Sequence, residues 1–339
     1  MKWWMPPAPS ASDLAKACPK ILPVSSTGPR PFWSIMIPTY NCGDYLRRTL
    51  ASVLPQALDP AVMQIEVIDD CSTKDDPEKV VAELGRGRVE FFRQPVNRGI
   101  PQTFNTCIER ARGEWVHILH GDDMVLPGFY EEYGRLIASN PDAVMVVGQV
   151  VIIDEKDRWM GLYGPLPNDQ TGIVYDFTLR QAIRQLGQFP GVVVRRDSYE
   201  RVGGFCTLLT HTADFDMWFR VGQLGPVLGT ERPFAMYRIH DAADTSKHRV
   251  LGTNIEQTFW VIRANAERLK QCLDESGWRE RLADTAETTA WDLDAKGILE
   301  GRLNQLRWAL LLRPSAGRLW RYIKTWVKVK IFRARLAMG

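Results

Sequence analysis

The stretch Trp115-Val-His-Ile-Leu-His120-Gly-Asp-Asp123 decides the fold of this chain. Five mostly apolar residues run directly into a polar turn that carries two carboxylates, Asp122 and Asp123. This pattern is typical of a buried strand that ends at the edge of a sheet. In an open α/β sheet, ligands bind in the crevice beyond the carboxyl ends of the strands. Carboxylate oxygens there suit a hard divalent cation such as Mg²⁺ or Mn²⁺, together with a diphosphate.

Apolar runs and helical patterns alternate around this stretch. The first apolar run, 32–37, ends at a proline and is followed by a helical pattern that begins at Asp44. This alternation predicts an α/β fold, with a mostly parallel mixed sheet flanked by helices. From about Gly252 the pattern is helical only. Further strands are expected at 65–68, 89–92, 115–119, 143–153, 191–194 and 234–239, and further helices at 77–84, 102–112, 129–139 and 214–224.

Length and composition exclude several classes of protein. The chain has 339 residues, and its hydrophobic (45%) and charged (24%) contents are ordinary for a soluble globular protein. No apolar run approaches the roughly 18 residues of a membrane-spanning helix. The six cysteines include no C-x-x-C pair, which argues against a zinc site or a disulfide scaffold and fits a reducing cytoplasm. Residues 1–30 are rich in Pro, Ser and Ala and are expected to form a flexible arm. They lack the apolar run of a signal peptide.

Charge is distributed unevenly along the chain. From Arg313 to the end there are eight Lys or Arg residues and no Asp or Glu, although the whole chain has a net charge of only +3. The preceding residues are therefore acidic on balance, which argues against nucleic-acid binding. No G-x-G-x-x-G or Walker A motif is present, which counts against dehydrogenases and P-loop enzymes.

Polar side chains follow three of the expected strands. They are Pro38-Thr39-Tyr40-Asn41, Asp69-Asp70-Cys-Ser-Thr73 and His120-Gly121-Asp122-Asp123. A single acidic strand end is weak evidence, since Asp commonly caps a following helix. The carboxyl ends of parallel strands share one edge of a sheet, so three such ends together indicate a binding site.

These motifs, together with Asn97-Arg-Gly99 and Asn105, resemble the successive motifs of family 2 glycosyltransferases. The resemblance covers about residues 32–130 and continues more weakly to about residue 245. The family consists of inverting enzymes of GT-A fold that use nucleotide-activated sugars. The resemblance therefore implies a glycosyltransferase with a nucleotide-sugar-binding half over 31–125 and an acceptor half over 126–250.

By resemblance, the first two motifs hold the nucleotide of the donor. Pro38, Thr39, Tyr40 and Asn41 would lie along it. Asp70 would accept a hydrogen bond from the imide N–H of uracil or thymine, whereas the N3 of cytosine is an acceptor. The expected donor is therefore a UDP- or dTDP-sugar. Asp69 either shares this role or caps its loop, and Arg98 either contacts the base or a phosphate or is an exposed loop residue.

The third motif aligns with the metal-binding Asp-x-Asp of the family. Asp122 takes the position of the metal-binding aspartate, and Mn²⁺ or Mg²⁺ would stabilise the departing nucleoside diphosphate. His120 replaces the first aspartate, so donor selectivity differs from the usual pattern, while Gly121 and Asp123 would shape the loop or contact the sugar. His240, in the family-like Tyr237-Arg-Ile-His240, is either a second metal ligand or a structural histidine.

An inverting transfer needs a general base beside the acceptor hydroxyl. Asp214 occupies the catalytic position of the family's Glu-Asp motif, in which Ala213 replaces the Glu and Asp216 is a neighbouring candidate. The alternative for Asp214 is a helix N-cap. At a helix N-terminus, the positive end of the dipole is expected to lower the pKa of Asp214 and keep it ionised.

The end of the chain predicts a membrane contact. Residues 251–312 are expected to form a helical extension, and 313–339 a basic amphipathic tail that lies on an anionic membrane surface. The alternative is a surface helix whose apolar face packs on the body. The membrane interpretation implies a cytoplasmic enzyme, peripheral on the inner face of the plasma membrane, and a lipid-linked glycan acceptor, as in bacterial surface-polysaccharide synthesis.

Two other functions stay open. A nucleotidyltransferase of similar fold would be expected to carry a Gly-rich loop after the first strand, where this chain has Thr39-Tyr40-Asn41. A degenerate domain that binds nucleotide-sugar without catalysis is the second alternative. His120 and Ala213 are the departures from the family pattern that support it.

Overall fold

The computed structural model describes residues 7–25, 28–164, 171–240, 244–269 and 274–336. The chain divides into two compact units. One is Lys16–Ile239, and the other combines Met1–Ala15 with His240–Gly339.

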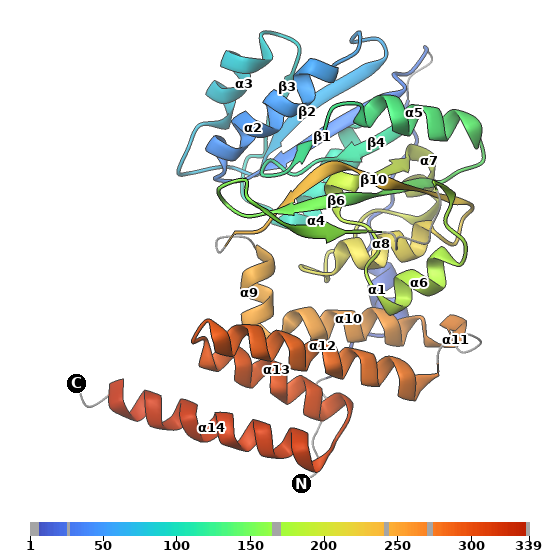
Figure 1. The fold of residues 1–339 in the computed structure, drawn as a ribbon. Coiled ribbons are helices and arrows are strands. Elements are labelled where there is room, and N and C mark those ends of the chain that lie inside the picture. Colours follow the sequence, from blue (N-terminus) through green and yellow to red (C-terminus); the bar gives the residue numbers. More distant parts are fainter. Residues whose placement is uncertain (1–6, 26–27, 165–170, 241–243, 270–273, 337–339) are drawn as a thin grey trace. The chain divides into compact units, whose positions relative to one another are not determined.

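The α/β unit is built on one mixed sheet, with strand order β3-β2-β1-β4-β9-β6-β10-β5 (Figure 1). Strands β3, β2, β1 and β4 pair parallel with one another, β9 is antiparallel to both β4 and β6, and β6 and β10 pair parallel. The predicted mixed α/β fold is therefore confirmed. The strands are β1 (Trp33–Thr39), β2 (Met63–Asp69), β3 (Glu90–Arg93), β4 (Trp115–Ile118), β5 (Met124–Val125), β6 (Met145–Ile153), β7 (Trp159–Tyr163), β8 (Gly172–Ile173), β9 (Val192–Arg195) and β10 (Val227–Arg238).

Helices cover both faces of this sheet. Alternate residues of β1, such as Ile35 and Ile37, pack in one apolar core with Leu46 of α2, Val80 of α3 and Tyr133 of α5. Helix α4 lies on the opposite face (Figure 1). The helices of this unit are α2 (Gly43–Val53), α3 (Pro77–Gly85), α4 (Ile100–Arg110), α5 (Phe129–Ser139), α6 (Phe177–Ile183), α7 (Arg196–Val202) and α8 (Ala213–Val221), with 3₁₀ turns η1 (Leu54–Gln56) and η2 (Phe189–Gly191).

Two segments are more structured than the sequence indicates. Residues 155–172, where the sequence pattern predicts no strand or helix, contain β7, which pairs antiparallel with β6, while 165–170 lie outside the described residues. The expected flexible arm contains helix α1 (Ala11–Lys16), and its continuation is anchored to the α/β unit. The Thr207 amide donates to the Ala17 carbonyl, the Gly204 amide donates to the Pro19 carbonyl, and Ile21 is buried. Backbone pairing across about 190 positions of sequence is not visible in local composition.

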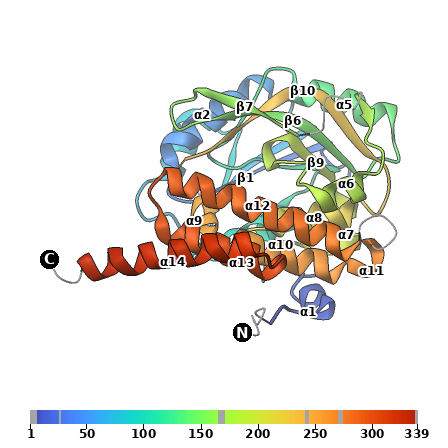
Figure 2. The same cartoon turned by 60° about the horizontal axis from the view of Figure 1, so that its bottom comes forward.

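Within 244–269 and 274–336, the regular elements of the second unit are all helices, as the pattern from Gly252 predicts. Its aromatic core includes Phe259, whose ring lies 5.8 Å from that of Trp278 and 6.2 Å from that of Trp308. In the part of the chain that the structure describes, no helix combines the length and apolar character needed to cross a membrane. Figure 2 shows the later helices side by side. They are α9 (Asp244–Leu251), α10 (Thr253–Ala264), α11 (Ala266–Leu269), α12 (Glu275–Ala295), α13 (Leu299–Leu312) and α14 (Ala316–Leu336).

Candidate active site

The turns after β1, β2 and β4 meet at one edge of the sheet. Thr39 is in register with Asp69, the Asp70 amide donates to the Thr39 carbonyl at 2.9 Å, and the Gly121 amide donates to the Pro38 carbonyl at 2.9 Å. Gly121 permits this approach, because a Cβ there would lie 3.0 Å from Thr39 Oγ1. The three polar strand ends therefore form one continuous surface.

Asn41 ties the first turn to the second. Its backbone is left-handed (φ 52°), and its Oδ1 accepts from the amides of Thr73 (2.8 Å) and Lys74 (2.9 Å). Asparagine tolerates this conformation because its short amide compensates with local hydrogen bonds. Thr39 is buried, whereas the Tyr40 ring is exposed. Within this motif, Tyr40 is thus the side chain that a ligand could cover.

Asp69 and Asp70 have separate roles. Asp69 is fully buried and accepts from Ser72 Oγ at 2.5 Å and Arg93 Nε at 2.7 Å, so it closes its own turn. Asp70 accepts from Gln94 Nε2 at 2.7 Å, and its other partners are backbone amides. Unlike Asp69, Asp70 is bound by the backbone of a separate loop.

That loop, Asn97–Gly99, wraps around the Asp70 carboxylate. The Arg98 amide donates to Oδ1 at 2.7 Å and the Gly99 amide to Oδ2 at 2.9 Å, while the Arg98 side chain is exposed. Burial raises the pKa of Asp70, and these amide hydrogen bonds oppose the shift. The side chain of Thr103 opposes the shift as well. Sequence reasoning missed buried Gln94, because a lone glutamine after a strand carries no motif.

The third turn gathers His120, Asp122 and Asp123, whose ligand atoms all lie within 4.8 Å of one another. The His120 ring stacks on Phe104, with centroids 5.1 Å apart. Among the described residues, buried His120 Nε2 and Asp123 Oδ2 find no hydrogen-bond partner. Buried polar atoms without partners are costly unless a ligand completes them. An imidazole nitrogen beside carboxylate oxygens is a donor set that fits Mn²⁺.

Electrostatics around this turn favour metal binding. Burial lowers the pKa of His120, which keeps the imidazole neutral, the form that binds metal ions. Burial raises the pKa of Asp123 well above its ordinary range, and the neighbouring Asp122 charge adds to the shift. A bound cation would reverse this penalty by compensating the two acids.

Arg238 is a site residue to which sequence reasoning gave no role. Its amide donates to Asp123 Oδ1 at 2.9 Å, and its Nε donates to the Asp122 carbonyl at 2.8 Å. The buried guanidinium also pairs with Asp157 at 2.5 Å and lies over the Tyr45 ring. Arg238 therefore clamps the acidic turn from β10. The strand-end position of Arg238, two residues before His240, was the available signal.

His240 begins the C-terminal segment of the helical unit, whereas Asp122 belongs to the α/β unit. Metal ligation by His240 stays a prediction.

Asp214 lies in the first turn of α8, one residue after the helix begins. Its Oδ2 accepts from Gln185 Nε2 at 2.8 Å, and its Oδ1 accepts from the Phe215 amide. The N-cap position belongs to Thr212, so Asp214 is not the cap. The expected lowering of its pKa is wrong: burial raises the pKa of Asp214 to about 7, against the opposing amide hydrogen bond. Desolvation thus outweighs the helix dipole.

Asp216, the neighbouring candidate, is part of a structural ion pair. It lies 2.8 Å from Arg220, which also donates to the Val202 and Gly204 carbonyls. Gly204 passes close to α4, because a Cβ there would lie 2.3 Å from Asn105 Oδ1. Asn105, which was quoted with the Asn97-Arg-Gly99 motif, therefore supports this segment through its hydrogen bonds with Phe205.

An aromatic cluster lies between the acidic turn and α8. The Phe189 ring is 4.4 Å from the His120 ring and 5.4 Å from Trp218 of α8. Phe104 closes the cluster at 4.6 Å from Phe189. The element that carries Asp214 and the turn that carries Asp122 are thus joined through packed side chains.

Acidic and polar turns at the carboxyl edge of such a sheet, with an acid on a helix beside them, define a glycosyltransferase of GT-A fold. The model of the family described as glycosyl transferase family 2 matches residues 34–203, which is half of the chain. The chain belongs to glycosyl transferase family 2.

Relatives and solved structures agree with this assignment. A chondroitin synthase of Escherichia coli is 35% identical over 241 residues, which cover 70% of this chain and 33% of that protein. An uncharacterized protein of Mycobacterium tuberculosis is 29% identical over 240 residues, covering 68% of this chain and 73% of that protein. The matched region is therefore a part of each relative.

Two solved structures share the fold. Staphylococcus aureus TarS 1–349 in complex with UDP-GlcNAc superposes with a TM-score of 0.60 at 16% identity, over 89% of this chain and 91% of that one. The mannosyltransferase PcManGT of Pyrobaculum calidifontis, in complex with GDP-Man and Mn²⁺, has a TM-score of 0.51 at 17% identity, over 97% and 86%. At these identities the likeness concerns the fold.

Proposed function

We propose that this enzyme transfers a sugar, with inversion, from a UDP- or dTDP-sugar to a hydroxyl of a glycan acceptor. The observation that carries the proposal is the convergence of the strand-end turns after β1, β2 and β4. There, Asp70 and the cluster of His120, Asp122 and Asp123 lie on one edge of the sheet. Asp214 is joined to this edge through the aromatic cluster.

The donor nucleotide binds at the first two turns in this proposal. The Asp70 carboxylate accepts the imide N–H of uracil or thymine, and the Tyr40 ring covers the base or ribose. Arg98 is exposed beside Asp70 and is free to reach a phosphate. TarS was solved with UDP-GlcNAc and PcManGT with GDP-Man, whose guanine also presents an N–H, so GDP belongs among the nucleotides to test.

A divalent cation, Mn²⁺ or Mg²⁺, is held by Asp122 together with His120 or Asp123. The unpartnered buried atoms of this cluster support that assignment. When bound, the cation supplies charge compensation for the departing nucleoside diphosphate. Arg238 holds this turn in place, because its amide donates to the Asp123 carboxylate and its Nε donates to the Asp122 carbonyl. His240 is proposed as a further ligand.

Asp214 is the general base. It takes the proton of the acceptor hydroxyl as that oxygen bonds to the anomeric carbon, and the sugar–phosphate bond breaks with the electron pair on the leaving phosphate. A pKa of about 7 suits this role, because the base is then poised near neutral pH. Gln185 orients the carboxylate through Oδ2.

The acceptor is proposed to be a lipid-linked glycan, as in bacterial surface-polysaccharide synthesis, and the enzyme to act at the cytoplasmic face of the plasma membrane. The basic composition from Arg313 onward supports this placement.

A nucleotide screen tests the proposal. Thermal stability is measured with UDP, dTDP, GDP and CDP, each with and without Mn²⁺, for the wild type and for Asp122→Asn. We expect UDP or dTDP to stabilise the wild type only with Mn²⁺, and Asp122→Asn to lose that effect. Stabilisation by none of the four would favour a non-catalytic scaffold, in line with His120 and Ala213. The anomeric configuration of the product, read by NMR, tests inversion.

A further inference from the structure

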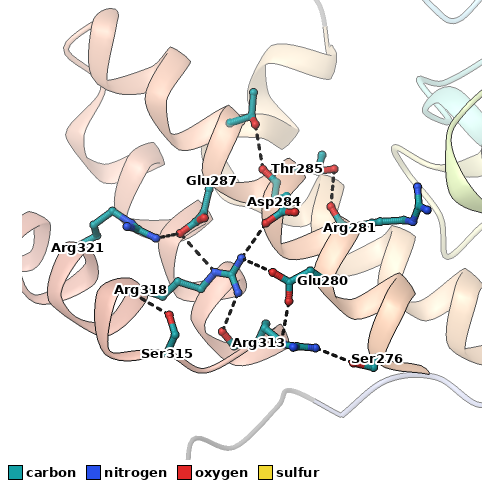
Figure 3. Close-up of polar contacts among 11 residues, drawn as sticks. Ser276, Glu280, Arg281, Asp284, Thr285, Glu287, Arg313, Ser315, Arg318 and Arg321 are labelled. Atoms are coloured by element: carbon teal, nitrogen blue, oxygen red, sulfur yellow. Dashed lines mark hydrogen bonds and ion pairs between the residues drawn. The ribbon is translucent and has the colours of Figure 1, made fainter. Parts of the chain in front are cut away.

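The last helix, α14, is clamped along one side by arginines (Figure 3). Buried Arg318 donates to Asp284 Oδ1 at 2.8 Å and to Glu280 Oε1 at 3.2 Å, both on α12. Arg321 forms an ion pair with Glu287, also on α12. These arginine charges are therefore compensated inside the helical unit.

The clamped side continues along the helix. Thr325 is fully buried and Val329 nearly so, and Arg333 pairs with Glu300 of α13 at 2.7 Å. Arg318, Arg321 and Thr325 thus lie on the side of α14 that faces α12, whereas the pair of Arg333 and Glu300 is exposed. An ordinary surface helix does the reverse, since it buries its apolar stripe and exposes its charges.

Apolar side chains occupy the opposite side of α14. Trp320 (66% exposed), Ile323 (43%), Val327 (42%) and Ile331 (51%) recur every three or four residues. At 3.6 residues per turn, this spacing places the four on one face, away from buried Thr325. They form the outer stripe. A continuous exposed apolar stripe marks an interaction surface.

Lysines border the outer stripe. By helical spacing, Lys324 and Lys328 follow one edge of the stripe and Lys330 the other, and all three are exposed. No acidic residue lies on α14. Arg318, Arg321 and Arg333 pair with acids of α12 and α13, so these three lysines are cations that the exposed face offers.

We propose that the outer stripe inserts into the interfacial layer of an anionic lipid bilayer, with Lys324, Lys328 and Lys330 on the lipid phosphates. Arg318, Arg321 and Arg333 act as clamps to the protein and do not bind lipid. This proposal deepens the membrane placement given above and names the surface that makes the contact. Tryptophan and aliphatic side chains flanked by lysine are the composition of helices that lie in the plane of a membrane surface.

The lysines beside the outer stripe favour a bilayer over a second copy of the chain as the binding partner of this face. Two outer stripes packed together would bring the bordering lysines of both helices into proximity, with no acidic residue on either helix to pair with them. An anionic headgroup layer compensates the same lysines. The bilayer is therefore the occupant that satisfies both the apolar and the charged part of this face.

Co-sedimentation of the full chain with vesicles tests the proposal. The vesicles are phosphatidylcholine alone, or phosphatidylcholine with phosphatidylglycerol. Lys324→Gln/Lys328→Gln/Lys330→Gln should weaken partitioning into the anionic vesicles by about a hundredfold, at roughly fivefold per lysine. Trp320→Gln/Ile331→Gln should weaken it roughly tenfold or more. All five side chains are exposed, so these variants keep the folded core.

Matched controls test whether the position of the substituted residues, beyond their type and charge, determines vesicle binding. Trp291→Gln removes an equally exposed tryptophan from α12 (61% exposed), and Lys79→Gln/Lys156→Gln/Lys296→Gln removes the same charge from elsewhere on the surface. Both should sediment like the wild type. The variant Trp320→Gln/Ile331→Gln is the outer-stripe variant, and equal sedimentation of this variant and the wild type would overturn the proposal. The proposal would also be overturned if the wild type formed a dimer without lipid and the outer-stripe variant were a monomer.

The result is distinguishable from a failure of the catalytic proposal. Stabilisation by UDP and Mn²⁺ is measured on the same outer-stripe variant and should equal that of the wild type. If no form of the chain binds a nucleotide, the donor assignment fails while the vesicle result still decides the role of α14.

Discussion

Asp214→Asn should make the enzyme more stable and nearly inactive, and the gain in stability should depend on pH. In the folded chain the pKa of Asp214 is about 7, raised from 3.8 by burial. Between about pH 4 and 7 the native state therefore holds a proton that the unfolded chain has lost. Native stability falls across this window as pH rises, because the carboxylate must ionise in a poorly solvated position.

The magnitude follows from the two pKa values. At about 1.4 kcal/mol per pKa unit, ionising Asp214 costs the native state at most about 4 kcal/mol once the pH exceeds 7. Solvent access at the site lowers this figure. Asparagine removes the charge and keeps the shape, so Asp214→Asn should raise the melting temperature by several degrees near pH 8. Near pH 5 the gain should be much smaller, because the wild-type carboxyl is then mostly neutral.

The same substitution, Asp214→Asn, should lower the catalytic activity. As a general base, Asp214 acts only when ionised, so the wild-type kcat/KM should fall about tenfold per pH unit below about 7. Asp214→Asn should lose a factor of roughly 10² to 10⁴ and show a flat profile in this range. Donor turnover is followed by release of the nucleoside diphosphate, and stability by thermal unfolding in matched buffers.

Asp216→Asn is the matched control, because it removes the acid two positions along the same helix. Its loss breaks the ion pair with Arg220 and should destabilise the unit by about 3 kcal/mol. The pH profile of kcat/KM should stay that of the wild type. Full transfer activity in Asp214→Asn, or the same thermal gain near pH 5 and pH 8, would refute the reasoning.

Three further changes test other parts of the structure. Asp70→Asn should weaken UDP binding roughly 10- to 100-fold and CDP binding much less, as read by calorimetry, because it removes an anionic acceptor for the imide. Gly204→Ala should cost about 1–3 kcal/mol in urea unfolding, since the new Cβ would lie 2.3 Å from Asn105 Oδ1, whereas Gly161→Ala meets open space and should be neutral. Arg318→Gln should cost about 2 kcal/mol and speed amide exchange along α14; unchanged exchange would contradict the clamp.

Local sequence patterns were sufficient to predict the fold class and the edge of the sheet at which the site lies. Apolar runs that end in Thr39, Asp69 and His120 identify strands, and parallel pairing then brings their ends together whatever the intervening residues are. The motifs at these ends were sufficient for the family. They were not sufficient to separate Asp69 from Asp70, because that difference lies in the Asn97–Gly99 loop that surrounds Asp70.

Long-range contacts decided what local patterns left open. Gln94, Gln185 and Arg238 reach the site from distant positions, and no short motif announces a side chain that acts through one hydrogen bond. The N-terminal segment shows the same limit. Its order depends on backbone pairing with Gly204 and Thr207, which its own composition does not encode.

By itself, the sequence determined the α/β fold, the acidic strand ends and the basic, aromatic character of the last helix, because each depends on residues close together in the chain. Only the tertiary structure decided how these residues act. Burial moved the pKa of Asp214 upward, although its helix position favours the opposite, since desolvation depends on the whole surroundings. Arg318 and Arg321 likewise form ion pairs with acids of α12, and the outer stripe of α14 is therefore exposed on the opposite side.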